Sequence, residues 1–178
     1  GLLREPLTGL KRVQVFLLTR VQHVADNTVK EIKSRIRRYN NTAAIFEAEH
    51  LPVAVESLAA DSEDREYSPQ ALQDKDVVLF CGIGNPVSFI KTIEGLKANI
   101  IDSFLFSDHY NYTEDDLVDI AVKASMNNVR WIITTEKDAS KFTEEMLAKL
   151  RKFDVGIYTL NIEIGFKDEE GFLECIDI

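Results

Sequence analysis

The 178-residue sequence is poor in the residues that staple small proteins together or bind metals through sulfur. It has two cysteines, Cys81 and Cys175, which lie in apolar stretches and lack the paired spacing of a metal site. We interpret both as buried free thiols of a reducing compartment, with a disulfide as the alternative. No apolar run approaches the roughly 18 residues that a membrane-spanning helix needs. The first residues do not resemble a signal peptide either.

Positive charge is also scarce. The sequence has 30 acidic and 21 basic residues, for a net charge of −9. A groove that follows a phosphate backbone needs the opposite balance, so the composition argues against nucleic-acid binding. Hydrophobic residues make up 45% and charged residues 29%, which is typical of a globular protein that buries its own core.

Several catalytic motifs are absent from the sequence. It contains no G-x-x-x-x-G-K-S/T, the loop that cradles phosphates in P-loop proteins. It also contains no H-E-x-x-H metal motif and no G-x-S-x-G nucleophile motif. The 178 residues therefore lack a phosphate-binding loop of the P-loop type.

What is present is an alternation of apolar runs and helical periodicity. Strands are expected at 13–18, 43–46, 77–80, 100–106, 131–134 and 155–160, with helices between most of them. Strands separated by helices require crossover connections, so we predict an α/β fold with a mostly parallel sheet and helices on both faces. The tail is predicted to form a hairpin from 162–166 and 172–176. The acidic, polar stretch 59–75 is predicted to be a linker.

The strongest candidate site is the glycine-containing turn after the strand 77–80. Gly82 and Gly84 allow the backbone to turn sharply and to approach a ligand closely. Asn85 is suited to cap the following helix, whose N-terminus is a natural anion site. However, Val87 stands where a dinucleotide-binding fingerprint needs a third glycine. A tight turn without a ligand is an equally good interpretation.

Asp108 and His109 follow the strand 100–106. A histidine beside a carboxylate can act as a general base, because its pKa lies near neutral pH. In a doubly wound sheet, ligands bind at this edge, beyond the carboxyl ends of the strands. The alternative is a turn with a surface histidine.

A third polar segment follows the strand 131–134 and consists of Thr134, Thr135, Glu136, Lys137 and Asp138. Its threonine and aspartate, three residues apart, are a good helix cap, so capping alone is one interpretation. Because parallel strands end at a common edge, a cleft shared by the three segments is the other.

Arg4 and Glu5 precede Pro6 near the start of the sequence. The arginine could grip a phosphate with its planar guanidinium. A plain surface turn explains the spacing equally well.

Taken together, these four segments resemble the tetraacyldisaccharide 4'-kinase family of lipid A biosynthesis. The resemblance rests on GLLREPLTGLKR at 1–12, FCGIGNPVSF at 80–89, FSDHYNYT at 106–113 and TTEKD at 134–138. Ser107 departs from the family's usual proline, and Tyr110 from its frequent second histidine. Arg20 departs from a common Thr-Lys after Thr19. None of these departures removes a residue that we assign to chemistry.

The resemblance implies the C-terminal part of a two-domain kinase, without the phosphate-binding half. Residues 1–58 would be the remainder of a P-loop-kinase-like domain, 59–75 an acidic linker, and 76–178 a Rossmann-like α/β domain. The parent would use ATP and Mg²⁺ to phosphorylate the 4'-hydroxyl of tetraacyldisaccharide 1-phosphate at the cytoplasmic face of the bacterial inner membrane. The membrane contact would belong mainly to the missing half.

The resemblance also assigns roles to residues. His109 and Asp108 would be catalytic, with His109 helping to activate the accepting hydroxyl. Arg4 and Glu5 would bind substrate. The remaining assigned residues would line the cleft, and these are Gly82, Gly84, Asn85, Thr134, Thr135, Glu136, Lys137 and Asp138. No metal ligand is assigned.

For the 178-residue chain itself, the resemblance implies a soluble, inactive fragment with no bound cofactor. Apolar surface left by a missing half could cause self-association. Two different readings stay open, namely a stand-alone α/β module that binds a sugar phosphate or nucleotide, and a non-catalytic interaction domain.

Overall fold

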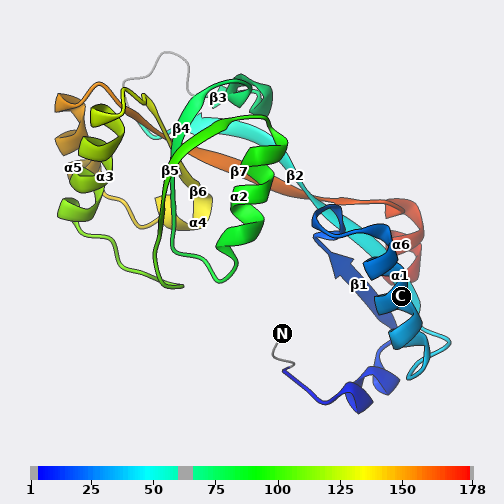
Figure 1. The fold of residues 1–178 in the computed structure, drawn as a ribbon. Coiled ribbons are helices and arrows are strands. Elements are labelled where there is room, and N and C mark those ends of the chain that lie inside the picture. The colour runs from blue at the N-terminus through cyan, green and yellow to red at the C-terminus, as the bar shows by residue number, and fades with distance from the viewer. Residues whose placement is uncertain (1–3, 60–65, 177–178) are drawn as a thin grey trace. The chain divides into compact units, whose positions relative to one another are not determined.

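The computed structural model describes residues 4–59 and 66–176. Their contacts group into two compact units, Gly1–Leu51 with Glu163–Ile178 and Pro52–Ile162 (Figure 1). Each unit is considered by itself. Strands β2 (Ala44–Ser57) and β7 (Gly156–Phe166) are long enough to contribute residues to both units.

The first unit is built around a parallel strand pair with a helical crossover. Strand β1 (Val15–Thr19) pairs in parallel with the start of β2. Helix α1 (Asp26–Arg37) connects them and buries Val29 and Ile36. The buried Asn40 fixes the turn after α1, since its Nδ2 donates to the carbonyl oxygens of Leu10 (3.0 Å) and Val13 (2.7 Å). The short helices η1 (Leu7–Arg12) and η2 (Val21–His23) flank β1.

The C-terminal tail differs from the predicted hairpin. Strand β7 continues to Phe166, and the chain then forms helix α6 (Glu169–Ile176). The side chain of Asp168 accepts a hydrogen bond from Gly171 N (3.0 Å), and two glutamates in the first turn favour a helix N-terminus. Phe172 then packs against Phe166 and Phe46. The hairpin prediction is therefore wrong.

The second unit contains a parallel sheet in the order β7-β6-β4-β5, with β2 on the far side of β7. Strand β4 (Asp76–Cys81) pairs in parallel with the edge strand β5 (Asn99–Leu105) and with β6 (Trp131–Thr135), and β6 pairs in parallel with β7. Leu58 N donates to Ile157 O (2.9 Å), and Lys167 N donates to Glu47 O (3.0 Å), as expected if β2 and β7 are antiparallel.

Helices cover both faces of this sheet. The side chains of β4 alternate between the two faces and are buried on each. Val78 and Phe80 pack on the face covered by α3 (Glu114–Met126), α5 (Glu144–Ala148) and η4 (Lys149–Lys152). The opposite face is covered by α2 (Pro86–Gly95) and η3 (Pro69–Leu72). The remaining short helix, α4 (Glu136–Ala139), follows β6 directly. The predicted α/β class, with a mostly parallel sheet and helices on both faces, is confirmed.

The stretch predicted to be a linker is partly folded. Residues 60–65 lie outside the described residues, whereas Glu66–Tyr67 form strand β3, antiparallel to β2. Leu72, in η3, is fully buried. The compact units divide the chain differently from the predicted domains, because residues 163–176 group with the N-terminal segment. The domain partition describes the resembled kinase and stays a prediction.

Two sequence expectations concern thiols and the membrane. Both cysteines are free, as predicted, but only Cys81 is buried. The burial predicted for Cys175 is wrong, because this residue lies on helix α6, in which no residue is buried. Within the described ranges, no helix is long and apolar enough to cross a membrane.

Candidate functional site

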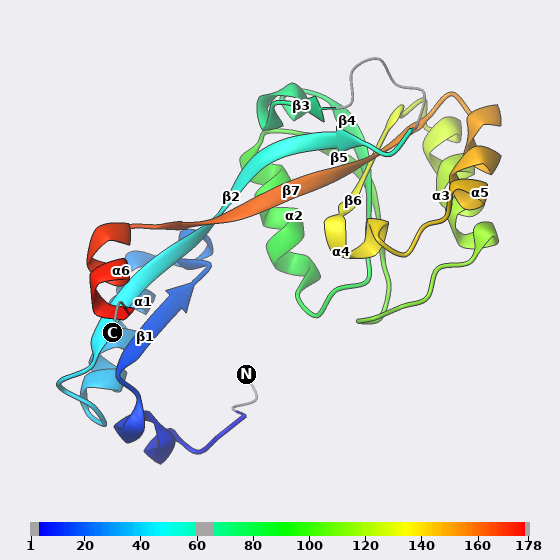
Figure 2. The same cartoon turned by 180° about the vertical axis from the view of Figure 1, so that it is seen from behind.

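Three loops leave the parallel sheet at the carboxyl ends of adjacent strands. Residues 82–85 join β4 to α2, residues 106–113 join β5 to α3, and β6 runs directly into α4. Because β6, β4 and β5 are neighbours and parallel, the loops meet at one edge of the second unit, seen from opposite sides in Figures 1 and 2. The structure therefore brings together all the predicted site residues that follow strands.

A buried carboxylate lies at the centre of this loop cluster. The side chain of Asp138 is fully buried, and its Oδ2 accepts hydrogen bonds from Gly82 N (2.9 Å) and Thr135 Oγ1 (2.8 Å). Asp138 N in turn donates to Thr135 Oγ1 (3.2 Å), the helix cap predicted from the sequence. Asp138 thus joins the loop after β4 to the loop after β6.

Lys141 neutralises this carboxylate and reaches the third loop. Its Nζ lies 2.9 Å from Asp138 Oδ1 and donates to the carbonyl oxygen of Tyr110 at 3.0 Å. The lysine side chain is 22% exposed, and its ammonium group lies over the ring of Tyr112, 5.2 Å from the ring centre. A buried carboxylate requires such a partner, because an uncompensated charge is costly in a low-dielectric interior.

Gly82 is at the tightest point of the cluster. A Cβ at this position would lie 3.0 Å from the Tyr112 hydroxyl, 3.1 Å from Ser107 O and 3.2 Å from Tyr110 Cβ. The peptide is also bonded on both sides, since Gly82 N donates to Asp138 and Gly82 O accepts from His109 N (3.2 Å). Gly82 is buried, so it serves the packing of the loops.

Asp108 and His109 are the exposed part of the cluster. His109 has a left-handed backbone (φ 61°), and its side chain is 76% exposed. Its Nε2 lies 3.8 Å from Asp108 Oδ2, while Lys137 Nζ donates to Asp108 Oδ1 at 2.9 Å. The hydrogen bond from Lys137 holds the pKa of Asp108 below its ordinary value. The result is an imidazole, a carboxylate and an ammonium group that face solvent together.

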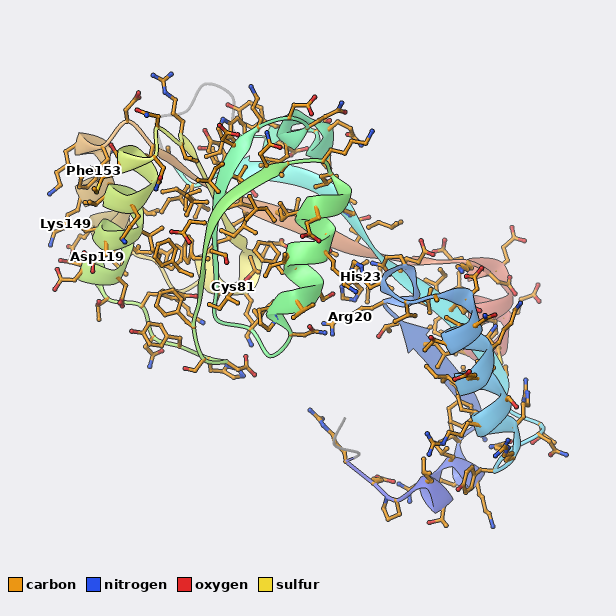
Figure 3. All side chains as sticks on the ribbon, viewed as in Figure 1. Arg20, His23, Cys81, Asp119, Lys149 and Phe153 are labelled. Carbon is orange, nitrogen blue, oxygen red and sulfur yellow. The ribbon has the colours of Figure 1, made fainter. Side chains whose placement is uncertain are left out.

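Two buried groups beneath this exposed surface, the Cys81 thiol and the Tyr112 hydroxyl, stay neutral near neutral pH. Burial, reinforced by the negative charge of Asp138, raises the pKa of Cys81, at the end of β4, to about 11 (Figure 3). Burial likewise raises the pKa of Tyr112. The hydroxyls of Tyr112 and Thr134 are buried and have no hydrogen-bond partner among the described residues. Neither Cys81 nor Tyr112 is thus placed to act as a nucleophile or base near neutral pH.

The residues predicted to line the cleft divide into two groups. Gly82, Thr134 and Asp138 are buried, and Thr135 caps α4. The exposed group comprises Gly84, Asn85, Glu136 and Lys137. Among these, Asn85 accepts a hydrogen bond from Ser88 N (3.1 Å), which is the predicted cap of α2.

Arg4 and Glu5 belong to the first unit. Both are exposed. The two carboxylate oxygens of Glu5 accept hydrogen bonds from Arg12 Nη2 at 2.8 and 2.6 Å. The carboxylate of Glu5, which is predicted to bind substrate, is therefore paired with the guanidinium group of Arg12.

The sequence interpretation missed Lys141. It lies just outside the TTEKD segment, in the turn after α4. Its spacing of three residues from Asp138 is a recognisable signal for an ion pair on a helical turn. Its contact with Tyr110, by contrast, depends on the fold.

No metal centre is evident in the part of the chain that the structure describes. No three His, Cys, Asp or Glu side chains gather there closely enough to hold an ion. The sequence also lacks the P-loop motif that holds phosphates and Mg²⁺ in P-loop proteins.

The fold and the loop cluster define an α/β protein with its candidate site at the carboxyl edge of a parallel sheet. The family model of tetraacyldisaccharide-1-P 4'-kinase matches residues 1–177, so the chain belongs to this family. The chain is 35% identical to the tetraacyldisaccharide 4'-kinase of Halothermothrix orenii, over 99% of its own length and 48% of that protein. Its identity to the kinase of Syntrophus aciditrophicus is 32%, over 97% and 46% of the two chains.

A solved structure gives the same picture of the fold. The chain is similar to LpxK from Aquifex aeolicus, solved in complex with ATP, with a TM-score of 0.55 and 19% identity. The match covers 98% of this chain and 45% of that one. The chain therefore spans about half the length of the relatives that it matches.

Proposed function

We propose that this chain acts as the C-terminal part of a tetraacyldisaccharide 4'-kinase, which transfers the γ-phosphoryl group of ATP to the 4'-hydroxyl of tetraacyldisaccharide 1-phosphate. Membership of the family supports the activity. The observation that carries the proposal is the exposed Asp108–His109 pair, at the edge of the sheet where α/β proteins bind ligands.

In this proposal, His109 is the catalytic residue of the chain. Its imidazole is exposed and can take a proton from the accepting hydroxyl. Asp108 is the carboxylate next to the ring, and its Oδ2 lies 3.8 Å from His109 Nε2. Lys137 holds Asp108 in place and contributes positive charge next to the site of phosphoryl transfer.

The chain does not supply the whole reaction. ATP and Mg²⁺ would be bound elsewhere in the proposed parent enzyme, because this sequence has no P-loop motif and no three potential metal ligands gather among the residues that the structure describes. We therefore propose that the isolated 178-residue chain does not turn over ATP. Arg4 and Glu5 are proposed to contact the phosphates or sugar of the substrate in the parent.

The domain partition and the location are also proposals. Residues 1–58 would complete a P-loop domain, 59–75 would connect it to 76–178, and the parent would contact the cytoplasmic face of the inner membrane. Leu173 and Ile176 on α6 are large exposed apolar side chains, which supports self-association of the isolated chain. Light scattering over a range of concentrations tests that point, and a constant monomer mass would contradict it.

The experiment that tests the function is a phosphoryl-transfer assay with γ-labelled ATP and tetraacyldisaccharide 1-phosphate. The gene is read upstream of the codon for Gly1, and the complete protein is compared with the 178-residue chain. We expect the complete protein to label the lipid and the isolated chain to release no phosphate from ATP. Failure of the complete protein to label the lipid would overturn the proposal, as would ATP turnover by the chain alone.

A further inference from the structure

We propose that Lys141 is a positioning residue for His109, acting through its ion pair with the buried Asp138. This inference rests on the proposed function only for its effect on catalysis. The structural part of the inference is that Lys141 joins three loops, and it can be tested without measuring kinase activity.

The first step is the bond from Lys141 to the loop that carries His109. Lys141 Nζ donates to the carbonyl oxygen of Tyr110 at 3.0 Å, directly after His109 in the chain. The same ammonium group lies 2.9 Å from Asp138 Oδ1. The lysine thus connects the loop after β5 to the loop after β6 with one group.

The second step runs through Gly82 to the backbone of His109. Asp138 Oδ2 accepts from Gly82 N at 2.9 Å, and Gly82 O accepts from His109 N at 3.2 Å. His109 N also approaches Asp108 Oδ1, at 3.1 Å. Two chains of hydrogen bonds from Lys141, one direct and one through Asp138 and Gly82, therefore end on the backbone around His109.

The third step is that His109 needs external support. Its backbone is left-handed (φ 61°), a conformation that costs energy for a residue with a Cβ. Its side chain is largely exposed, so packing does not fix the ring. Its position is set by its backbone, and its backbone is set by the bonds that Lys141 and Asp138 organise.

The test compares Lys141→Met with Lys149→Met, a matched change at an exposed lysine that pairs with Glu114 on the same unit. Hydrogen exchange of the His109 amide is followed by NMR in the 178-residue chain. We expect exchange in Lys141→Met to be faster by about tenfold or more, and unchanged in Lys149→Met. Lys141→Arg keeps charge and donors and is expected to restore protection.

Loss of Lys141 leaves the buried Asp138 carboxylate without its cationic partner, so the single variant is studied together with the double variant Asp138→Asn/Lys141→Met. This double variant removes both charges and keeps an oxygen for Gly82 N, and the same acceleration of exchange at His109 is expected. A folded variant lacking Lys141 with an unchanged His109 amide would overturn the proposal. So would a wild-type His109 amide that exchanges at the rate of an unstructured peptide, a measurement that requires no variant.

In the complete kinase, Lys141→Met is expected to lower kcat by about tenfold to a hundredfold with little change in the KM for ATP. A purely structural role would lower the amount of folded enzyme and leave kcat per active molecule unchanged. Absence of kinase activity in the wild type would count against the proposed function, while the amide-exchange result would stand on its own.

Discussion

The loop cluster of the second unit has a buried part and an exposed part, each with a lysine–aspartate ion pair of 2.9 Å, that differ in their exposure to water. The buried part consists of Asp138, Lys141 and Gly82, joined by hydrogen bonds of 2.9 Å through groups that have little or no contact with water. The exposed part consists of Asp108, His109 and Lys137, whose side chains are 44 to 76% exposed. Apart from Lys141, which lies just outside TTEKD, both parts come from the segments 80–89, 106–113 and 134–138, yet only the exposed part is accessible to a substrate.

One short sequence segment can therefore contain both buried residues that hold the loops together and exposed residues that are available to a substrate. The resemblance assigns Asp138 to the lining of the cleft, but its oxygens accept hydrogen bonds from Gly82, Thr135 and Lys141. The side chain of His109 is 76% exposed, and its Nε2 lies 3.8 Å from Asp108 Oδ2. The buried residues hold the loops, and the exposed ones are left available for chemistry.

The largest loss of stability is expected when the buried carboxylate of Asp138 is removed. Asp138→Ala leaves the ammonium of Lys141 and the N–H of Gly82 without their partner, so we expect a loss of about 3–5 kcal/mol in the free energy of unfolding. The matched change Asp108→Ala removes an exposed carboxylate and is expected to leave stability near that of the wild type. Urea denaturation measures both. Equal losses would show that the division into buried and exposed parts is wrong.

A smaller effect is expected from filling the space at Gly82. Gly82→Ala places a methyl group 3.0 to 3.2 Å from three neighbouring atoms, which should cost about 1–3 kcal/mol. The control is Gly95→Ala at the end of α2, where nothing lies within 4 Å of the new methyl. That change should be neutral or should stabilise the helix by up to about 1 kcal/mol. The order of the two melting temperatures is the result to compare.

The smallest effect concerns the thiols. Cys81 is buried with its pKa raised from 9.0 to about 11, so the folded state favours the neutral thiol. Its contribution to stability is present below pH 9 and is lost as pH rises toward 11, where the unfolded chain ionises first. At pH 8, we expect a thiol reagent to modify one cysteine, Cys175, in the folded chain and both in denaturant.

The control for the thiol prediction is a pair of alanine variants. Cys175→Ala keeps the buried thiol and should show the full alkaline loss of stability, whereas Cys81→Ala should show a smaller one. Rapid modification of Cys81 in the folded chain would contradict the burial described here.

Much of this fold could be predicted because its signals are local. Asn85 and Thr135 each stand at a helix start and accept the capping bond expected from the sequence, and Thr113 does the same at the start of α3. The tail could not be predicted, because 172–176 is a short apolar segment whose periodicity fits a strand or a helix. The side chain of Asp168 and the packing of Phe172 on Phe46 decide for the helix.

The sequence could predict which loops form the candidate site, but not which of their side chains are buried and which are exposed. The carboxyl ends of β4, β5 and β6 could be expected to meet, and they do. The burial of Asp138 could not be read from TTEKD, because it depends on Lys141 and on a carbonyl oxygen about thirty residues away. Sequence spacing does not record such long-range contacts.

The assignment of the chemistry to the exposed part of the cluster is tested most directly by His109→Ala in the complete kinase. The control is Asn111→Ala, at an exposed residue of the same loop. Stability and kcat are measured on the same samples. The account predicts that His109→Ala keeps the melting temperature of the wild type and loses about 10²- to 10⁴-fold in kcat, while Asn111→Ala changes neither. A His109→Ala enzyme with the kcat of the wild type would contradict the assignment of chemistry to the exposed part of the cluster.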